Sequence, residues 1–215
     1  MSIDRAIQAI AEFQGSSLTQ SLSAIESSVL GLSGTDLEAF CGSRSIDNAF
    51  MSSAASIKKV AGQINVIIHA AGILCSLPQI LGSGEVVESV SLGAGNTGRK
   101  FDLETNFRVA EFKFIDWQGG TESIRQNGVF KDFYQLAEHE TQKSKHLYVV
   151  GTGFPLKFLT GGRALSSVLS RYPDILHEIG QKYGPRVLRV CDYYNLKKSD
   201  VEICDVSPYI GKGAV

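Results

Sequence analysis

Three charged residues, Asp102, Glu111 and Lys113, have types and a spacing that suit hydrolysis of a phosphodiester bond. Carboxylate oxygens are the hard ligands that Mg²⁺ prefers, and Mg²⁺ commonly binds proteins through one or two carboxylates. Such an ion polarises a phosphate and lowers the pKa of an attacking water molecule. A lysine amine close to Glu111 can orient that water or stabilise the charge that develops on the phosphate oxygens. We therefore expect a metal-dependent phosphodiester-cleaving site.

The strand that carries Glu111 and Lys113 is expected to be central in a sheet. In the segment FRVAEFKFID, residues 107–116, side chains alternate across the strand, and both faces are mainly apolar. Glu111 and Lys113 share one of these faces, where charge is costly. If Thr105–Asn106 forms a two-residue turn, Asp102 lies on the same face, diagonally across from Glu111 and roughly 7 Å away between backbones.

Repulsion between the two acids makes a cation favourable at this face. Two carboxylates about 5 Å apart repel by roughly 3 kcal/mol at an effective dielectric constant of about 20. Lys113, a bound metal ion or protonation of one acid would each relieve this repulsion. In the same register Lys100 faces Glu111, so an ordinary cross-strand ion pair is an alternative explanation of that acid.

The elements that must position these residues divide the chain into an all-helical N-terminal segment and an α/β domain. Residues 1–80 carry apolar residues at helical spacing, as at Ile3, Ile7 and Ile10. We place the boundary after residue 60, with an N-terminal extension at 1–60 and the α/β domain at 61–215. The later patterns predict strands at 86–92, 100–104 and 107–116, helices within 121–145, a strand at 146–152, helices within 160–182, a strand at 186–193 and an irregular tail.

Composition and charge are those expected of a cytoplasmic protein. The chain is 43% hydrophobic and 20% charged, with a net charge of −1. Residues 1–98 carry a net charge of −4 and residues 99–215 carry +3, which suits a phosphate-facing second half. No two cysteines have zinc-ligand spacing, and the N-terminus lacks a signal-peptide pattern. The apolar stretch Ile64–Leu77 is interrupted by polar residues and closed by Pro78, so we expect no membrane partner.

The pattern Asp102…Glu111-Phe112-Lys113, on a hairpin followed by a helix and a further strand, resembles the PD-(D/E)XK nuclease superfamily over residues 60–155. Members share a restriction-endonuclease-like αβββαβ core with a mixed sheet. The resemblance implies that Asp102, Glu111 and the Phe112 carbonyl bind Mg²⁺, for which Mn²⁺ can substitute, and that Lys113 is catalytic. Phe101 stands where many members have a proline.

The resemblance also suggests residues that would complete the site. Members often add an acid from the first core helix, but Gln63–Leu77 contains none, so Glu88 is preferred for this role over Glu85. The helix after the Glu-x-Lys strand often supplies polar or basic residues. The candidates for contact with nucleic acid are Arg125, Gln126, Lys131, Gln118 and Arg163. Four histidines lack partners at ligand spacing and are interpreted as structural or surface residues: His69, His139, His146 and His177.

The function implied by the resemblance is that of a Mg²⁺-dependent endonuclease acting on nucleic acid, with DNA preferred over RNA. A role in restriction or antiviral defence would fit a small enzyme with a helical extension. The N-terminal helices would then form a homodimer or bind a partner protein. Two alternatives stay open. The first is a catalytically inactive nuclease-fold protein that binds or assembles a partner. The second is a ribonuclease toxin that uses the same site.

Overall fold

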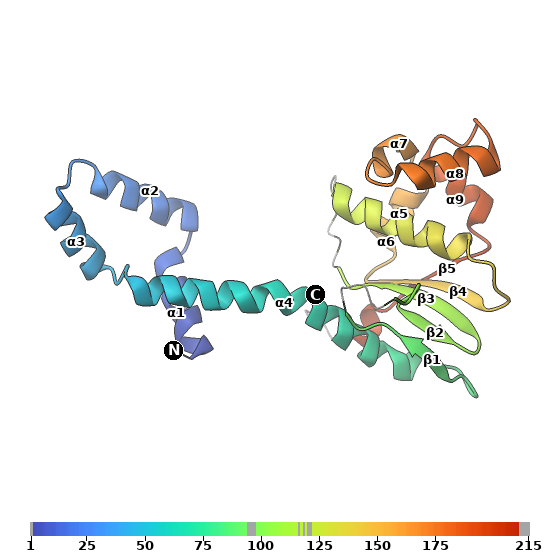
Figure 1. Cartoon of the computed structure of the whole chain (residues 1–215), viewed down its shortest axis with the longest axis horizontal. Helices are drawn as coiled ribbons and strands as arrows, with labels where there is room; N and C mark the ends of the chain where they lie inside the picture. The colour runs from blue at the N-terminus through green and yellow to red at the C-terminus, as the bar shows by residue number, and fades with distance from the viewer. Residues whose placement is uncertain (1, 94–97, 116, 118, 120–121, 211–215) are drawn as a thin grey trace. The chain divides into compact units, whose positions relative to one another are not determined.

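The computed structural model describes residues 2–93, 98–115, 117, 119 and 122–210. The chain divides into two compact units, Met1–Asn65 and Val66–Val215. The division after Asn65 and the boundary expected after residue 60 both fall within one helix, α4 (Asn48–Ile80). The chain is an α/β protein, with helices first and a mixed sheet interleaved with helices after them (Figure 1).

The first unit is entirely helical in its described residues, as the sequence predicts. It contains α1 (Ile3–Gln14), α2 (Leu18–Val29), α3 (Gly34–Ser43) and the first part of α4. Serine side chains at Ser2, Ser17 and Ser33 accept hydrogen bonds from backbone N–H groups in the first turns of α1, α2 and α3. Such caps satisfy donors that have no partner within the helix.

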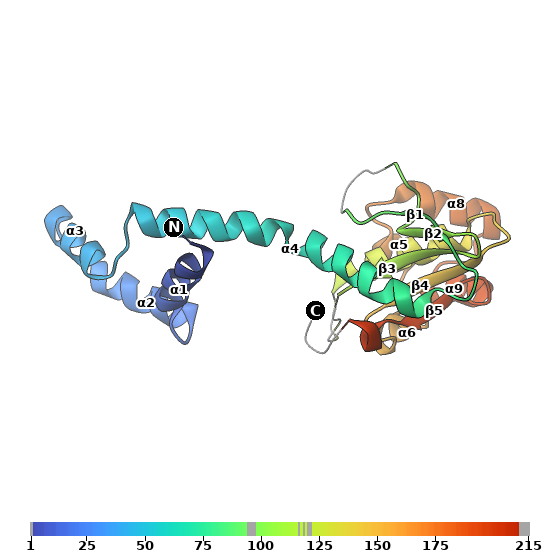
Figure 2. The same ribbon diagram turned by 90° about the horizontal axis from the view of Figure 1, so that it is seen from below.

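The second unit is built on a five-stranded sheet with the order β1-β2-β3-β4-β5, which can be followed strand by strand in Figure 2. The first three strands form an antiparallel meander, and the pairs β3–β4 and β4–β5 are parallel. Parallel pairing requires crossover connections, which the later helices provide. The strands are β1 (Val87–Val90), β2 (Leu103–Thr105), β3 (Arg108–Lys113), β4 (Ser144–Val149) and β5 (Glu202–Asp205).

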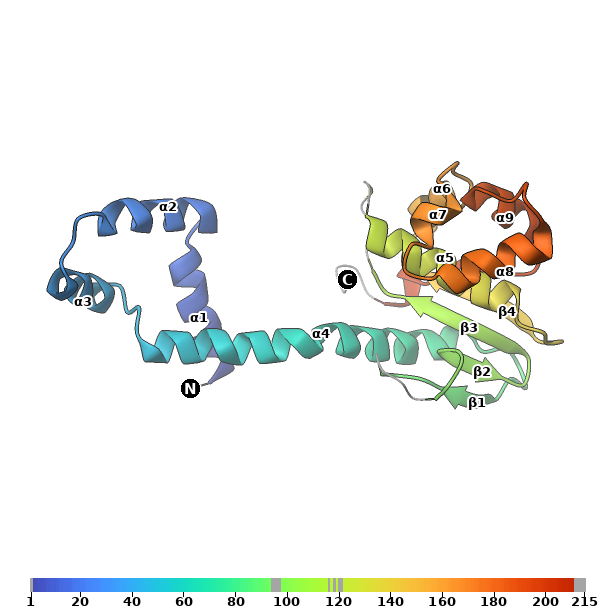
Figure 3. The same ribbon diagram turned by 45° about the horizontal axis from the view of Figure 1, so that its top comes forward.

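Helices cover both faces of this sheet, as Figures 1 and 3 show. On one face, Val109 and Leu147 pack in a cluster with Phe130 and Phe133 of α5. On the other face, Phe112 packs in a second cluster that includes residues of the C-terminal part of α4. Strand β3 is therefore buried on both sides, as its two apolar faces predict. The covering helices are α5 (Ser123–Ala137), α6 (Gly153–Leu159), α7 (Leu165–Val168), α8 (Pro173–Tyr183) and α9 (Val190–Lys197), and a short 3₁₀ helix, η1 (Ser207–Tyr209), follows β5.

The register between β2 and β3 differs from the expected one by two residues. A two-residue turn at Thr105–Asn106 would have paired Glu104 with Phe107, but Glu104 pairs with Val109. The Thr105 hydroxyl accepts hydrogen bonds from the backbone N–H groups of Phe107 and Arg108 at 3.1 and 2.9 Å, which holds a longer turn. Because the shift is even, the paired residues of the two strands keep their predicted faces.

The last strand was misplaced by the sequence prediction. Residues 186–193 do not form a strand, because α9 begins at Val190. The Asp192 carboxylate accepts hydrogen bonds from the backbone N–H groups of Leu188 and Arg189, and it thereby caps this helix. Strand β5 lies instead within the tail that was expected to be irregular.

Helix α4 extends to Ile80, in agreement with the helical pattern of residues 1–80. Pro78 lies in the last turn of a helix that reaches Ile80, where a missing N–H costs only one helical bond. The whole helix is long and apolar enough to cross a membrane by length and composition. Within the second unit, however, Ile73 of α4 is fully buried against the sheet. At Gly72 a Cβ atom would come within 2.6 Å of the Phe114 ring, so this glycine permits close packing.

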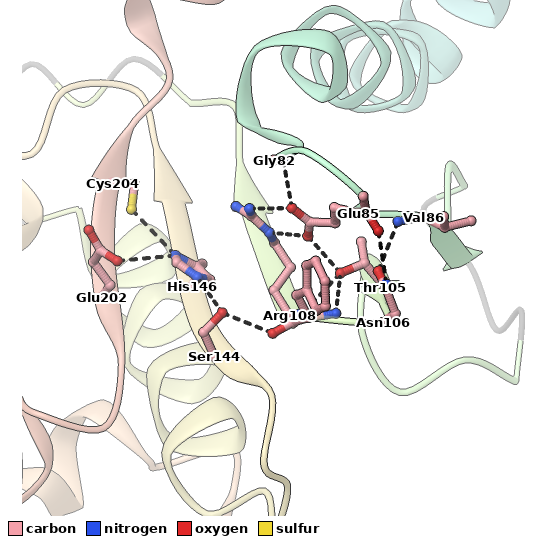
Figure 4. A network of polar contacts seen from close by, with 12 residues as sticks. Gly82, Glu85, Val86, Thr105, Asn106, Arg108, Ser144, His146, Glu202 and Cys204 are labelled. Atoms are coloured by element: carbon pink, nitrogen blue, oxygen red, sulfur yellow. Dashed lines mark hydrogen bonds and ion pairs between the residues drawn. The ribbon is translucent and has the colours of Figure 1, made fainter.

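An ion pair at the start of the meander joins β3 to the loop before β1. The Glu85 side chain, 1% exposed, contacts Arg108 Nε at 2.5 Å and also accepts a hydrogen bond from the Thr105 hydroxyl (Figure 4). Burial alone would raise the pKa of Glu85, but hydrogen bonds from Arg108, Gly82 and Thr105 outweigh it and lower that pKa to about 2. The carboxylate is therefore charged throughout the neutral range.

We expect Glu85→Gln to lower the free energy of unfolding by about 3 kcal/mol at pH 7, because the buried Arg108 loses its counter-charge. A carboxyl group whose pKa is lowered in the folded protein stabilises the fold at pH values above its unfolded-state pKa of about 4.5. This stabilisation is lost as the pH falls toward 2. The difference between the proteins should therefore shrink across that window in urea unfolding measurements. Glu104→Gln is the control, because Glu104 pairs with Lys143 at the surface and its loss should cost less than about 1 kcal/mol. Equal effects of the two substitutions would contradict the account.

Candidate active site

Asp102 immediately precedes β2 and lies beside the middle of β3. Leu103 pairs with Ala110, so the next position along this register places Asp102 beside Glu111. The Asp102 carboxylate accepts a hydrogen bond from the Phe112 backbone N–H at 3.0 Å. Its other oxygen lies 3.3 Å from Nε2 of His69, on α4. These contacts fix the acid where the two strands meet.

Glu111 is buried on the face of β3 that packs against α5, and its carboxyl group lies beside that of Asp102. Burial, together with the negative charges of Asp132 and Asp102, outweighs the effect of Lys113 and raises the pKa of Glu111 to about 9. For Asp102, burial acts in the same direction, but hydrogen bonds from His69 and from the Phe112 backbone N–H lower its pKa overall.

Lys113 points to the same face and forms an ion pair with Asp132 of α5. Burial opposes the charge on Lys113, but Asp132 and Glu111 outweigh it and raise the pKa of the amine. The Asp132 side chain is 8% exposed, and burial raises the pKa of its carboxyl group. Three carboxyl groups, those of Asp102, Glu111 and Asp132, therefore surround one lysine.

This donor set fits a divalent cation. The raised pKa of Glu111 beside the acid Asp102 indicates that this pocket lacks positive charge. A hard divalent ion would supply that charge and would be bound by carboxylate oxygens of Asp102 and Glu111. The Phe112 side chain points away, stacked between Phe114 and Tyr148, so only its backbone could take part.

Two side chains near this site were missed by the sequence reasoning. Asp132 stands directly after Lys131 and lies on the buried stripe of α5 together with Val129 and Phe133. A charged residue within an apolar stripe at helical spacing was the available signal. His69 was interpreted as structural, yet it lies on the helix where an additional acid was sought.

The expected supplementary acid, Glu88, lies elsewhere. Its carboxylate pairs with Lys143 at 2.7 Å, and its side chain is 48% exposed. The alternative, Glu85, is bound to Arg108. The alternative ion pair between Lys100 and Glu111 is also not formed, because Lys100 contacts His139 at 3.0 Å and the register places Asp102 beside Glu111.

The candidate nucleic-acid contacts are divided between two cavities that share Trp117. Lys113 and Arg125 line a cavity of about 240 Å³ that is otherwise mainly apolar. Gln126 and Arg163 line a second cavity of about 320 Å³. Lys131 lies instead over the ring of Tyr172, and Gln118 falls outside the described residues.

We expect Glu111→Gln to stabilise the metal-free fold by about 2 kcal/mol at pH 8. A carboxyl group with a raised folded-state pKa stays protonated in the native protein and ionises on unfolding, so stability falls as pH rises from about 4.5 to about 9. Glutamine removes this dependence. Thermal unfolding in EDTA from pH 6 to pH 9 tests the prediction, and Mg²⁺ should stabilise only the wild-type protein. A variant less stable than the wild type at pH 8 would contradict it.

Comparison of the chain with protein-family models, with curated proteins and with solved structures gives no match. The structure shows an α/β protein with a five-stranded mixed sheet after N-terminal helices.

Proposed function

We propose that the protein is a Mg²⁺-dependent endonuclease of the PD-(D/E)XK type, with a restriction-endonuclease-like core. The observation that carries this proposal is the proximity of Asp102, Glu111 and Lys113 where β2 and β3 meet. The order of elements, with a helix before three antiparallel strands and then a helix and a parallel strand, supports it.

Each residue has a defined part in the proposed reaction. Asp102 and Glu111 would hold the metal ion, which when bound polarises the scissile phosphate and lowers the pKa of water. His69 positions Asp102, and Asp132 positions the amine of Lys113. The charged amine donates hydrogen bonds to the phosphate while water attacks phosphorus and the bond to the leaving oxygen breaks. The attacking water gives up a proton to solvent, and the leaving oxygen takes up a proton from solvent.

The two cavities around Trp117 support a nucleic-acid substrate. Lys113 lines the first cavity, so a substrate bound in this cavity would lie beside the candidate catalytic residue. The second cavity carries Lys157 and Arg163, whose charges suit backbone phosphates. Within the described part of the chain, Trp117 Nε1 and Gln126 Oε1 are buried without a hydrogen-bond partner.

A specific observation also favours a second candidate, a nuclease-fold protein that assembles with a partner. The helices of the first unit expose large apolar side chains, which mark protein interaction surfaces when they are contiguous. They include Ile3, Ile7, Leu18, Leu22, Leu30 and Met51. For the enzyme itself, we propose a cytoplasmic role in restriction or defence, with these helices forming a homodimer or binding another protein.

Digestion of plasmid DNA and of structured RNA by the full-length protein tests the proposal. We expect cleavage with Mg²⁺ or Mn²⁺, none in EDTA, and a higher rate on DNA than on RNA. The variant Asp102→Ala/Lys113→Ala is the matched control and should not cleave. Absence of cleavage in every condition, with nucleic-acid affinity retained by the variant, would instead support the binding protein. Cleavage of RNA alone would indicate the ribonuclease toxin.

A further inference from the structure

A second cluster of metal-ligating side chains lies on strands β4 and β5. Among the described residues, His146, Glu202 and Cys204 are the group of three whose donor atoms all lie within 4.8 Å of one another. The parallel register pairs His146 with Glu202 and Tyr148 with Cys204. Figure 4 shows the imidazole ring facing both the carboxylate and the thiol.

The two distances from His146 Nδ1 to the other donor atoms match those required by a tetrahedral zinc ion, and all three donor atoms lie within 4.8 Å of one another. His146 Nδ1 lies 3.7 Å from Cys204 Sγ and 3.5 Å from the Glu202 carboxylate. Zinc binds nitrogen and oxygen at about 2.0 Å and sulfur at about 2.3 Å, so tetrahedral angles separate these donors by roughly 3.3–3.6 Å. The ion therefore fits between side chains that already face one another, without movement of either strand.

Hydrogen bonds behind His146 leave the correct nitrogen free to bind metal. Its Nε2 lies 2.9 Å from the Ser144 hydroxyl, and that hydroxyl donates to the Phe107 carbonyl at 3.1 Å. Because the hydroxyl proton is directed to the carbonyl, the hydroxyl oxygen accepts from Nε2–H. The lone pair is then on Nδ1, the atom that faces Glu202 and Cys204. Zinc-binding histidines usually donate their other N–H group in this manner.

This cluster is separate from the site of Asp102 and Glu111. Cys204 and Tyr148 belong to the apolar cluster on the α4 side of the sheet, and the His146 and Tyr148 rings stack 5.6 Å apart. Glu111 and Lys113 face α5 on the other side. The neighbouring cation, Arg108, is already paired with Glu85, so it leaves little net repulsion for a metal ion.

We propose that His146, Glu202 and Cys204 bind one Zn²⁺ ion that joins β5 to β4. The thiolate and imidazole select zinc over Mg²⁺, which prefers oxygen ligands. The Glu202 side chain is 72% exposed, so a water molecule has access to the fourth position. Strand β5 has four residues and, among the described strands, pairs with β4 alone. The ion would therefore strengthen the attachment of β5 to the sheet.

Cobalt substitution of the full-length protein tests the site. We expect one equivalent of Co²⁺ to give a thiolate-to-cobalt charge-transfer band and strong tetrahedral visible bands, both removed by Zn²⁺. Cys204→Ser should abolish the charge-transfer band, and His146→Gln should weaken Zn²⁺ binding at least about tenfold. Cys191→Ser, which replaces another partly buried cysteine, and Asp102→Asn should leave the spectrum unchanged.

A readout on the wild-type chain avoids dependence on variants that fail to fold. Zn²⁺ should slow alkylation of Cys204 by iodoacetamide at least about tenfold, with the rate at Cys191 unaffected. Absence of a charge-transfer band, retention of that band in Cys204→Ser, or equal alkylation with and without Zn²⁺ would each overturn the proposal. None of these measurements involves cleavage of nucleic acid, so they are independent of the proposed endonuclease.

Discussion

Replacing Lys113 with methionine is expected to lower kcat for DNA cleavage by about 10²–10³-fold, with little change in the affinity for Mn²⁺. The amine is the positive group among three carboxyls, and a donor aimed at developing charge commonly contributes a factor of this size. Methionine keeps the length of the side chain but cannot donate a hydrogen bond. Single-turnover cleavage at saturating Mg²⁺ measures the effect.

The control for this substitution concerns the fold. Methionine at position 113 leaves Asp132 buried without its cation, which costs stability. The double variant Lys113→Met/Asp132→Asn removes both charges and should restore much of the stability without restoring kcat. Lys182→Met, on the exposed side of α8, removes one positive charge from the surface and should leave kcat unchanged. Cleavage by Lys113→Met at the wild-type rate would exclude a catalytic role for the amine.

Asp102→Asn is expected to have the second large effect, raising the Kd for Mn²⁺ at least about tenfold and lowering kcat by about 10²-fold or more. Asparagine keeps the size of the side chain, and its carbonyl can still accept the hydrogen bond from Phe112 N–H. What it loses is the negative charge and one ligand oxygen. Calorimetric titration with Mn²⁺, followed by cleavage assays across a range of metal concentrations, separates the two losses.

Asp174→Asn is the matched control, because Asp174 is an exposed acid in the first turn of α8. It removes the same charge at a distance from the candidate site and should change neither Mn²⁺ affinity nor kcat. If Asp102→Asn behaved like Asp174→Asn, Asp102 could not be a metal ligand.

The faces of the strands were predictable because side-chain alternation is a local property. The pattern FRVAEFKFID correctly identified a strand buried on both sides, and an even error in register left Asp102 beside Glu111. The turn itself was wrong because the Thr105 side chain holds two backbone N–H groups. A single sequence does not specify that longer turn.

The contributions of distant segments were harder to predict. Asp132 and His69 reach the site from helices on opposite faces of the sheet, and no local spacing links either of them to Lys113 or Asp102. The last strand was misplaced because residues 186–193 are apolar enough for a strand, while Asp192 starts a helix there. In each case a tertiary contact decided between two locally acceptable outcomes.

The measurement that tests the central claim most directly is anomalous diffraction from a crystal of the full-length protein soaked in Mn²⁺. The account predicts a manganese peak within coordination distance of the carboxylate oxygens of both Asp102 and Glu111, with the Lys113 amine beside it. Side chains of Asp102 and Glu111 that carry no manganese, in a crystal where the ion is bound at other carboxylates, would contradict it.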